Sequence, residues 1–313
     1  MEAPHAATLS TLHPMPTEFI SNCFTSINRA EVLVFASALF AATAAASEWR
    51  LVWSDEFETD GSPDPAKWGY DLGTGASVGL IGWGNNEAQY YTDRPENARI
   101  EDGILIIEAR REPWQSAQYT SARMVTRNRG DWLYGRVEVR ARMPWGRGTW
   151  PAIWMLPTDW DYGGWPDSGE IDIMEHVGFD HGRVHGTVHT GAFNHMQGTE
   201  RGGSIMVPDL HETFRTYAIE WDEDRIRWFV DDTEYFVFER EAGWGSAEWP
   251  FDRRFHLIHN IAIGGNWGGQ RGIDNEIFPQ RMEVEYVRVY ERADAVPMRG
   301  AWIHFFHPNY TGD

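Results

Sequence analysis

Three carboxylates stand close together in the segment 169–176 (GEIDIMEH), among apolar residues. Ionised carboxylates are seldom buried without a partner, because removing them from water is costly. In a strand, Glu170 and Asp172 lie two positions apart and point to the same face. Glu175 lies five positions from Glu170, which places it on the opposite face of a regular strand. A β-bulge at 173–174 adds one residue and returns Glu175 to the face of the other two.

This spacing suits one type of chemistry. A helix would hold residues 170 and 175 about 140° apart, so it cannot bring them together. In a bulged strand their Cα atoms lie about 13 Å apart, and two glutamate side chains leaning toward each other close most of that gap. Two carboxyl groups about 5–5.5 Å apart form the catalytic pair of a retaining glycosidase. Asp172, between them, would orient the nucleophile and push the pKa values of its neighbours apart.

Two other interpretations of the three acids remain open. Oxygen ligands of this kind also bind Ca²⁺, although the Asp/Asn-Gly loop chemistry of the usual calcium sites is absent here. The acids could also lie on a solvated strand edge. The apolar residues at 171, 173 and 174 argue against an edge, because they indicate a strand with one buried face.

Aromatic and histidine side chains surround the acids in sequence. Trp150 and Trp154 are four positions apart and would share one strand face, and Trp267 stands among four glycines. Indoles stack on the apolar faces of sugars, and the alternative role for each tryptophan is core packing. His185 and His189 share a face of the next strand and could line the same cleft. A structural role is the alternative for His185.

The elements that position these residues read as short strands separated by Gly, Pro, Asn and Asp. Alternating or continuous apolar patterns predict strands at 104–109, 136–142, 184–189, 226–230, 256–263 and 282–290. The sequence shows no βαβ alternation, no repeat of fixed period and no linker between two domains. It therefore predicts an all-β sandwich or barrel of antiparallel sheets.

The N-terminal region predicts secretion. Arg29 precedes the apolar run 32–46, which ends in small residues, as in a secretory signal cleaved near Ala46. A membrane anchor is the alternative, but the run is too short to span a bilayer comfortably. Cys23, the only cysteine, lies in the segment that would be removed, so no disulfide framework or thiolate metal site is expected.

Charge excludes some partners. The formal net charge is −20, which argues against binding nucleic acid or an anionic membrane. Lys67 is the only lysine, which suits a salty medium or reflects genomic base composition.

The motif Glu170-x-Asp172-x-x-Glu175 resembles the signature of glycoside hydrolase family 16 in its bulged form. The resemblance continues through four further segments in order, and it covers roughly residues 49–291. It is greatest to bacterial laminarinases, which are endo-β-1,3-glucanases with a concave β-jelly-roll cleft. These segments are GWGNNEAQYYT (82–92), YGRVEVRARMPWGRGTWPAIWMLP (134–157), VHGTVHT (184–190) and GGNWGG (264–269), followed by VEYVRVY (284–290).

The resemblance implies a β-jelly-roll sandwich of two curved antiparallel sheets with a concave substrate cleft. The expected organisation is a secretory pre-region at 1–46, a catalytic domain at 47–293 and a C-terminal tail at 294–313. It implies Glu170 as nucleophile, Glu175 as acid/base and Asp172 as the assisting carboxylate. Substrate-binding residues would be Trp150, Trp154, His189, Trp267 and Asn86. The expected protein is a secreted, monomeric enzyme that cleaves β-1,3-glucan with retention of configuration and needs no cofactor for catalysis.

The family resemblance also implies a structural Ca²⁺ held by Glu56, Gly103 and Glu285, although the family more often has aspartate at the position of Glu285. Alternative substrates are β-1,3-1,4-glucan and, with Arg123, Arg127, Arg140 and Arg147 as counter-charges, agar- or carrageenan-type chains. A non-catalytic glucan-binding protein on the same fold is the remaining alternative. Such proteins usually lack the catalytic acids, which this chain retains.

Overall fold

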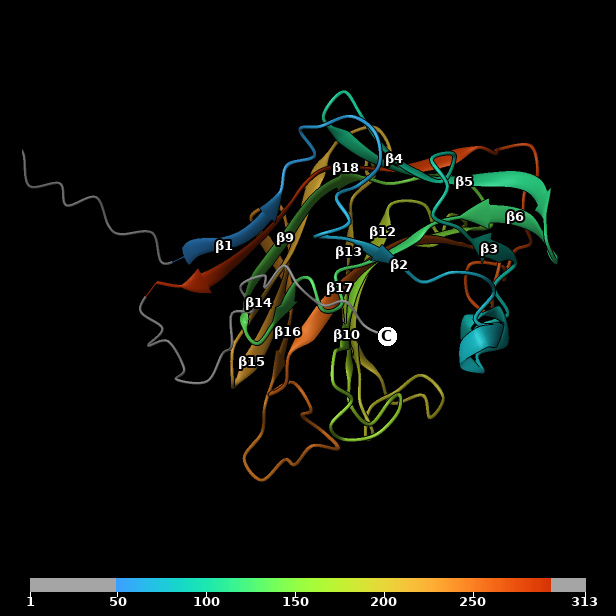
Figure 1. Cartoon of the computed structure of the whole chain (residues 1–313). Helices are drawn as coiled ribbons and strands as arrows, with labels where there is room; N and C mark the ends of the chain where they lie inside the picture. The colour runs from blue at the N-terminus through green and yellow to red at the C-terminus, as the bar shows by residue number, and fades with distance from the viewer. Residues whose placement is uncertain (1–48, 294–313) are drawn as a thin grey trace, which may run out of the picture. The chain divides into compact units, whose positions relative to one another are not determined.

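A computed structural model describes residues 49–293 of the chain (Figure 1). The predicted secretory segment 1–46 and the predicted tail 294–313 lie outside the described residues. Within the described part, no helix is long and apolar enough to cross a membrane.

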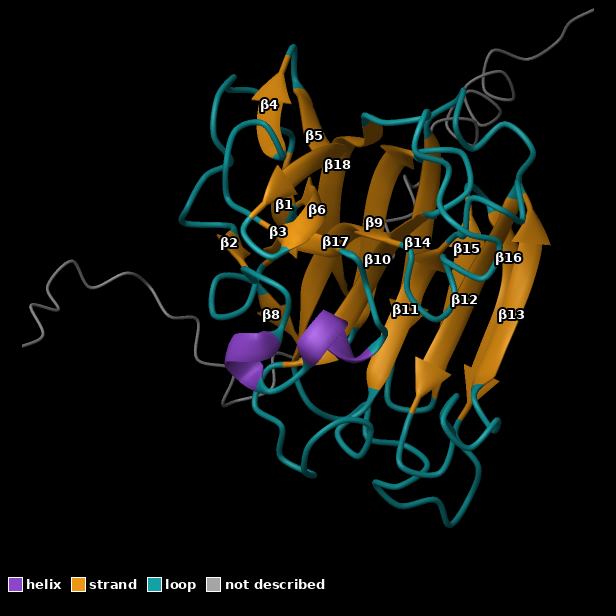
Figure 2. Ribbon diagram, turned by 90° about the vertical axis from the view of Figure 1, so that its right-hand side faces the viewer, coloured by secondary structure: helices purple, strands orange, loops and turns teal. Residues whose placement is uncertain are grey.

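Strands are the main regular structure of the described part, with loops between them and two short 3₁₀ helices near its beginning (Figure 2). The helices are η1 (Ala76–Val78) and η2 (Ile81–Gly84). The strands are β1 (Trp49–Asp55), β2 (Gly69–Tyr70), β3 (Gln89–Tyr91), β4 (Ala98–Glu101), β5 (Ile104–Trp114), β6 (Ala117–Ser121), β7 (Arg123–Val125), β8 (Asp131–Trp132), β9 (Gly135–Arg142), β10 (Thr149–Pro157), β11 (Glu170–Glu175), β12 (Arg183–His189), β13 (Arg201–Met206), β14 (Arg215–Trp221), β15 (Arg225–Val230), β16 (Thr233–Glu239), β17 (Phe255–Ile263) and β18 (Gln280–Arg292).

The strands form two sheets. One has the order β16-β15-β14-β9-β18-β5-β6-β3, with β1 joined to β18 and β4 joined to β5. The other has the order β13-β12-β11-β10-β17-β7-β2, with β8 joined to β17. The predicted sandwich of two curved antiparallel sheets is confirmed (Figure 1). One pair departs from it, because β3 and β6 run parallel.

Alternation of side chains along the strands builds the core between the sheets. In β9, Val137, Val139 and Ala141 are buried, while the residues between them are only half-buried. Side chains of β11 and β17 contribute to the same core from the other sheet. Each sheet thus has one face in the core, and the outer face of the β13-to-β2 sheet is free to carry a site.

Strand β11 contains the predicted bulge. Glu170 pairs with His189 and Asp172 with Thr187, but Glu175 pairs with His185, so three steps along β11 match two along β12. The register with β10 shifts at the same place. Ile173 and Met174 are both buried in the core. The extra residue therefore sends two consecutive side chains inward and leaves all three acids on the outer face.

The opposite sheet supports this bulge. The indole Nε1 of Trp228, on β15, donates a hydrogen bond of 2.8 Å to the main-chain oxygen of Asp172. A bulge disrupts the regular ladder, and a buried carbonyl without a partner is costly. Gly186 makes room for this contact, because a Cβ there would lie 2.4 Å from the Trp228 ring.

Candidate active site

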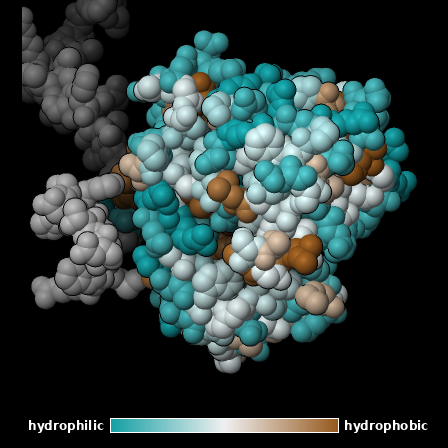
Figure 3. All heavy atoms as spheres, turned by 45° about the vertical axis from the view of Figure 1, so that its right-hand side comes forward, coloured by the Kyte–Doolittle hydropathy of each residue, from teal (hydrophilic) through white to brown (hydrophobic). Residues whose placement is uncertain are grey.

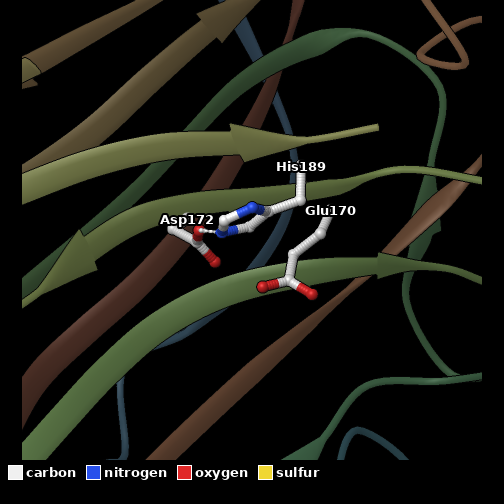
Figure 4. A group of neighbouring side chains, drawn as sticks. All are labelled: Glu170, Asp172 and His189. Carbon is white, nitrogen blue, oxygen red and sulfur yellow. Dashed lines mark ion pairs between the residues drawn. The ribbon is translucent and has the colours of Figure 1, made fainter. Parts of the chain in front are cut away.

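The three acids and one histidine meet on the outer face of the sheet. Ligand atoms of Glu170, Asp172 and His189 all lie within 4.8 Å of one another. Figure 4 shows the three side chains pointing toward one another, with an ion pair of 3.4 Å between His189 Nε2 and Asp172 Oδ2. Asp172 and His189 are buried, whereas Glu170 and Glu175 keep part of their surface exposed. The two glutamates are therefore the acids that a substrate can reach.

An indole donor holds each glutamate. Trp165 Nε1 donates to Glu170 Oε2 at 2.6 Å, and Trp150 Nε1 donates to Glu175 Oε1 at 2.9 Å. Each hydrogen bond fixes one carboxyl oxygen and favours the ionised form of its acid. Glu170 also shares a side-chain hydrogen bond with Asp172. An indole thus orients each glutamate, and Asp172 adds a second contact to Glu170.

Burial sets the protonation of the cluster. Desolvation, followed by the nearby charge of Asp172, raises the pKa of Glu170 to about 8. Desolvation also raises the pKa of Glu175 to about 7, against the opposing hydrogen bond from Trp150. The pKa of Asp172 is raised well above its usual range by burial and by the charge of Glu175. The cluster therefore retains protons near neutral pH, as a site that needs one protonated and one ionised carboxyl requires.

The predicted substrate residues next to Glu175 lie close together. Trp150 and Trp267 pack edge to face, with ring centroids 5.6 Å apart. The His185 ring lies 5.0 Å from the Trp267 ring, and His185 pairs with Glu175 across the sheet. His185 therefore lies on the same face as the acids, as the strand pattern predicts.

Trp154 follows Trp150 by four residues on β10. Its Nε1 donates to Asn260 Oδ1 at 2.7 Å, and Asn260 Nδ2 donates to the Tyr91 hydroxyl at 3.0 Å. The guanidinium of Arg123 lies 4.7 Å from the Trp154 ring centroid and 4.5 Å from that of Trp83. Trp154 is thus held rigidly, with one arginine between two indoles.

Asn86 lies at the rim of this arrangement. It is exposed, and its Nδ2 donates to Asn266 Oδ1 at 2.7 Å. Asn266 directly precedes Trp267, and its main-chain N–H bonds to the carbonyl of Asn85 at 2.7 Å. The structure therefore brings Asn86 next to the predicted Trp267 platform.

Several contacting residues escaped the sequence prediction. Trp165 binds Glu170, yet it lies in the loop before β11, where no periodicity reports direction. His195 lies in another loop, with its ring 5.1 Å from His189 and 5.2 Å from Trp165. Asn260 sits within an apolar strand, and a polar residue at that position was a signal that could have identified it.

The residues predicted to bind calcium have other partners. Both carboxylate oxygens of Glu56 accept hydrogen bonds from Arg288, at 3.0 and 2.8 Å, and Glu285 forms an ion pair with Arg140. Gly103 lies in the turn between β4 and β5, with φ +76°. As arranged, the two carboxylates do not fit a shared Ca²⁺, because the ion would have to displace a guanidinium from each. Calcium binding stays a prediction.

The four arginines considered for sulfated substrates are each paired with an acid. Arg123 and Arg127 bind Asp71 at 3.1 and 3.3 Å. Arg140 pairs with Glu285, and Arg147 lies 3.8 Å from Asp274. Each guanidinium already has an acidic partner, although Arg123 and Arg127 share one, so the structure does not favour an anionic polysaccharide.

The comparisons of this chain with known proteins agree with one another. The profile of Glycosyl hydrolases family 16 matches residues 85–288, which include the three acids. The chain is 60% identical over 254 residues to the beta-glucanase of Rhodothermus marinus, covering 78% of this chain and 86% of that protein. It is 40% identical over 256 residues to a glucan endo-1,3-beta-glucosidase of Cryptopygus antarcticus, covering 77% and 91%. The X-ray structure of the laminarinase from Rhodothermus marinus superposes with a TM-score of 0.75 at 59% identity, over 78% of this chain and 97% of that chain.

Proposed function

The chain belongs to glycoside hydrolase family 16, and from this premise we propose that it is an endo-acting β-1,3-glucanase that hydrolyses laminarin-type glucan with retention of configuration. The observation that carries the proposal is the bulge in β11, because it places Glu170, Asp172 and Glu175 on one face. The raised pKa values of the two glutamates support acid–base work by this pair.

In the first step, Glu170 attacks the anomeric carbon, and the bond from that carbon to the glycosidic oxygen breaks. Protonated Glu175 delivers its proton to the departing oxygen. Trp165 keeps the attacking carboxylate in place through its N–H, 2.6 Å from Oε2. The attacking form of Glu170 is the ionised one, so Glu170 gives up its proton before this step, and the hydrogen bond from Trp165 favours that form.

In the second step, Glu175 acts as a base and takes a proton from water. The water oxygen forms the new bond to the anomeric carbon, and the bond to Glu170 breaks. Two inversions give net retention. Trp150 holds Glu175 through both steps, because its N–H stays on Oε1 while the acid loses and regains its proton.

Neutral β-1,3-glucan is the substrate class that the relatives' activities and the paired arginines both favour. The test is a panel of laminarin, lichenan, agarose and carrageenan, with reducing ends as the readout. We expect the highest specificity constant on laminarin, and proton NMR should show the β-anomer forming first. Binding to laminarin without cleavage, unchanged in Glu170→Gln, would instead indicate a glucan-binding protein.

We further propose that the enzyme acts outside the cell after removal of residues 1–46. The support is the apolar run 32–46 after Arg29, which lies outside the described residues. Intact mass of the protein secreted by its native host tests this. A mature chain beginning near Ser47 is expected, and retention of the first 46 residues would contradict the proposal.

A further inference from the structure

An exposed apolar loop lies beyond the last strand of the sheet that carries the acids. We define the apolar loop as residues 72–86, which follow β2 and include η1 and η2. It carries four of the nine large apolar side chains that are exposed among residues 49–293, and these four are Leu72, Val78, Leu80 and Ile81, at 46, 63, 51 and 80%. Figure 3, which turns this side forward, shows several brown and tan patches on a mainly teal and white surface. Clusters of this kind mark interaction sites.

The loop holds these side chains outward through its own backbone. Leu80 N–H bonds to the Gly75 carbonyl at 2.9 Å, and Glu87 N–H bonds to the Gly82 carbonyl at 3.0 Å. The Trp83 indole donates to the Gly73 carbonyl at 3.1 Å. Because the loop is closed by these bonds, its apolar tips cannot collapse onto the body without breaking them. It is a preorganised surface, which lowers the cost of binding.

The loop is continuous with the face that carries the acids. Arg123 lies between Trp83, in the loop, and Trp154, on β10. The Asn85 carbonyl binds the N–H of Asn266, beside Trp267. In the sheet order, β2, after which the loop begins, is four strands from β11, or about 19 Å at the usual strand spacing, while the far end of the loop, at Asn85, returns to Asn266 and Trp267 near the acids. A substrate that runs from the acids to the beginning of the loop must span several sugar units.

Charge identifies the occupant. The chain has a net charge of −20, yet residues 72–86 contain no Asp, Glu, Lys or Arg. A membrane surface or a nucleic acid would require basic residues. A neutral polysaccharide requires none, and its sugar rings present apolar C–H faces. We propose that the apolar loop binds the distal part of a long β-glucan chain or particle while the acids cleave it; this inference rests on the proposed function.

The test compares serine substitutions in the loop with a serine substitution on the other sheet. Leu80→Ser and Ile81→Ser, combined, remove apolar surface from the loop. Leu51→Ser is the matched control, because Leu51 is 49% exposed and lies on β1 in the other sheet. We expect the ratio of specificity constants on long laminarin and on a tetrasaccharide to fall about tenfold in the loop variant and to stay unchanged in the control. Retention on insoluble β-1,3-glucan should fall in parallel.

Other outcomes separate the explanations. An unchanged ratio, or an equal fall in the Leu51 control, overturns the inference while leaving the catalytic proposal intact. A wild-type protein that neither cleaves nor retains β-glucan overturns the proposed function instead. If wild type is a dimer by light scattering and the loop variant is a monomer with an unchanged ratio, the loop contacts a second copy and the glucan inference fails. Circular dichroism of each variant checks that the fold is retained.

Discussion

The outer face of the acid-bearing sheet differs on the two sides of β11. Toward β10, β17 and β7 it presents indoles, an arginine between two of them, and a chain of side-chain hydrogen bonds. Toward β12 and β13 it presents Thr187 and His185, which pair with Gly202 and Ser204 at an exposed edge. One side is built mainly of indoles, and the other carries the rings of His185 and His189 and ends in small residues at an open edge. A substrate therefore gains most of its binding energy on one side of the bond that is cut.

The largest effect is expected at the acids between the two sides. Glu170→Gln keeps the shape of the side chain and removes the nucleophile, so kcat on laminarin should fall by about 10⁴-fold or more. Affinity for laminarin, measured by calorimetry, should change little, because the aromatic side is intact. A comparable loss of affinity would show that the acids, and not the indoles, dominate binding.

Removing one indole tests the asymmetry directly. Trp154→Ala should lower kcat/KM on laminarin about 30-fold, because it deletes a held tryptophan platform. Ser204→Ala on the opposite side is the comparison, and its kcat/KM should stay within about threefold of wild type. Equal losses from the two variants would abolish the distinction between the sides.

A smaller effect is expected when the hydrogen bond by which the opposite sheet supports the bulge is removed. Trp228→Phe keeps most of the buried ring and removes the N–H that binds the Asp172 carbonyl. We expect kcat to fall about tenfold with little change in KM, since about 1–2 kcal/mol of hydrogen bonding at the bulge is lost. Trp221→Phe, in the same sheet with its own buried hydrogen bond, serves as the control for a loss of stability alone. A rise in KM with normal kcat in Trp228→Phe would contradict this role.

The smallest effect concerns pH and stability. The pKa of Glu170 rises from 4.5 to about 8 on folding, so the stability from its buried neutral form is present below pH 4.5 and is lost as pH rises through about 8. Glu170→Gln stays neutral, so its Tm should exceed that of wild type by about 4 °C at pH 8.5 and converge on it near pH 4.5. Glu276→Gln, at an exposed position, is the control variant. A Tm difference independent of pH would contradict the shift.

The sequence predicted the residues whose direction follows from strand periodicity, and it missed residues that loops bring to the site. The positions of Glu170, Asp172 and Glu175 followed from counting residues along a strand, and the register confirms the bulge. Trp165 escaped because loop geometry, not spacing, brings its indole to Glu170.

Arg123 shows a second limit of the sequence. Its charge was considered for sulfated sugars, yet it packs between Trp83 and Trp154 and pairs with Asp71. Asp71 and the two indoles that contact Arg123 come from separate strands and loops, and only the tertiary fold brings them together. Sequence spacing carries no information about such contacts.

The bulge in β11 also affects how the site can tolerate changes in length. Insertions and deletions within strands are usually ruinous, because a slip of one residue reverses every side chain beyond it. Here the surplus residue is accommodated by sending both Ile173 and Met174 into the core. Deleting Ile173 would leave Glu170 and Glu175 four positions apart, which a straight strand also places on one face. The two glutamates can therefore share one face either in a bulged strand or in a regular strand that is one residue shorter. A one-residue deletion here removes core volume without turning an acid away.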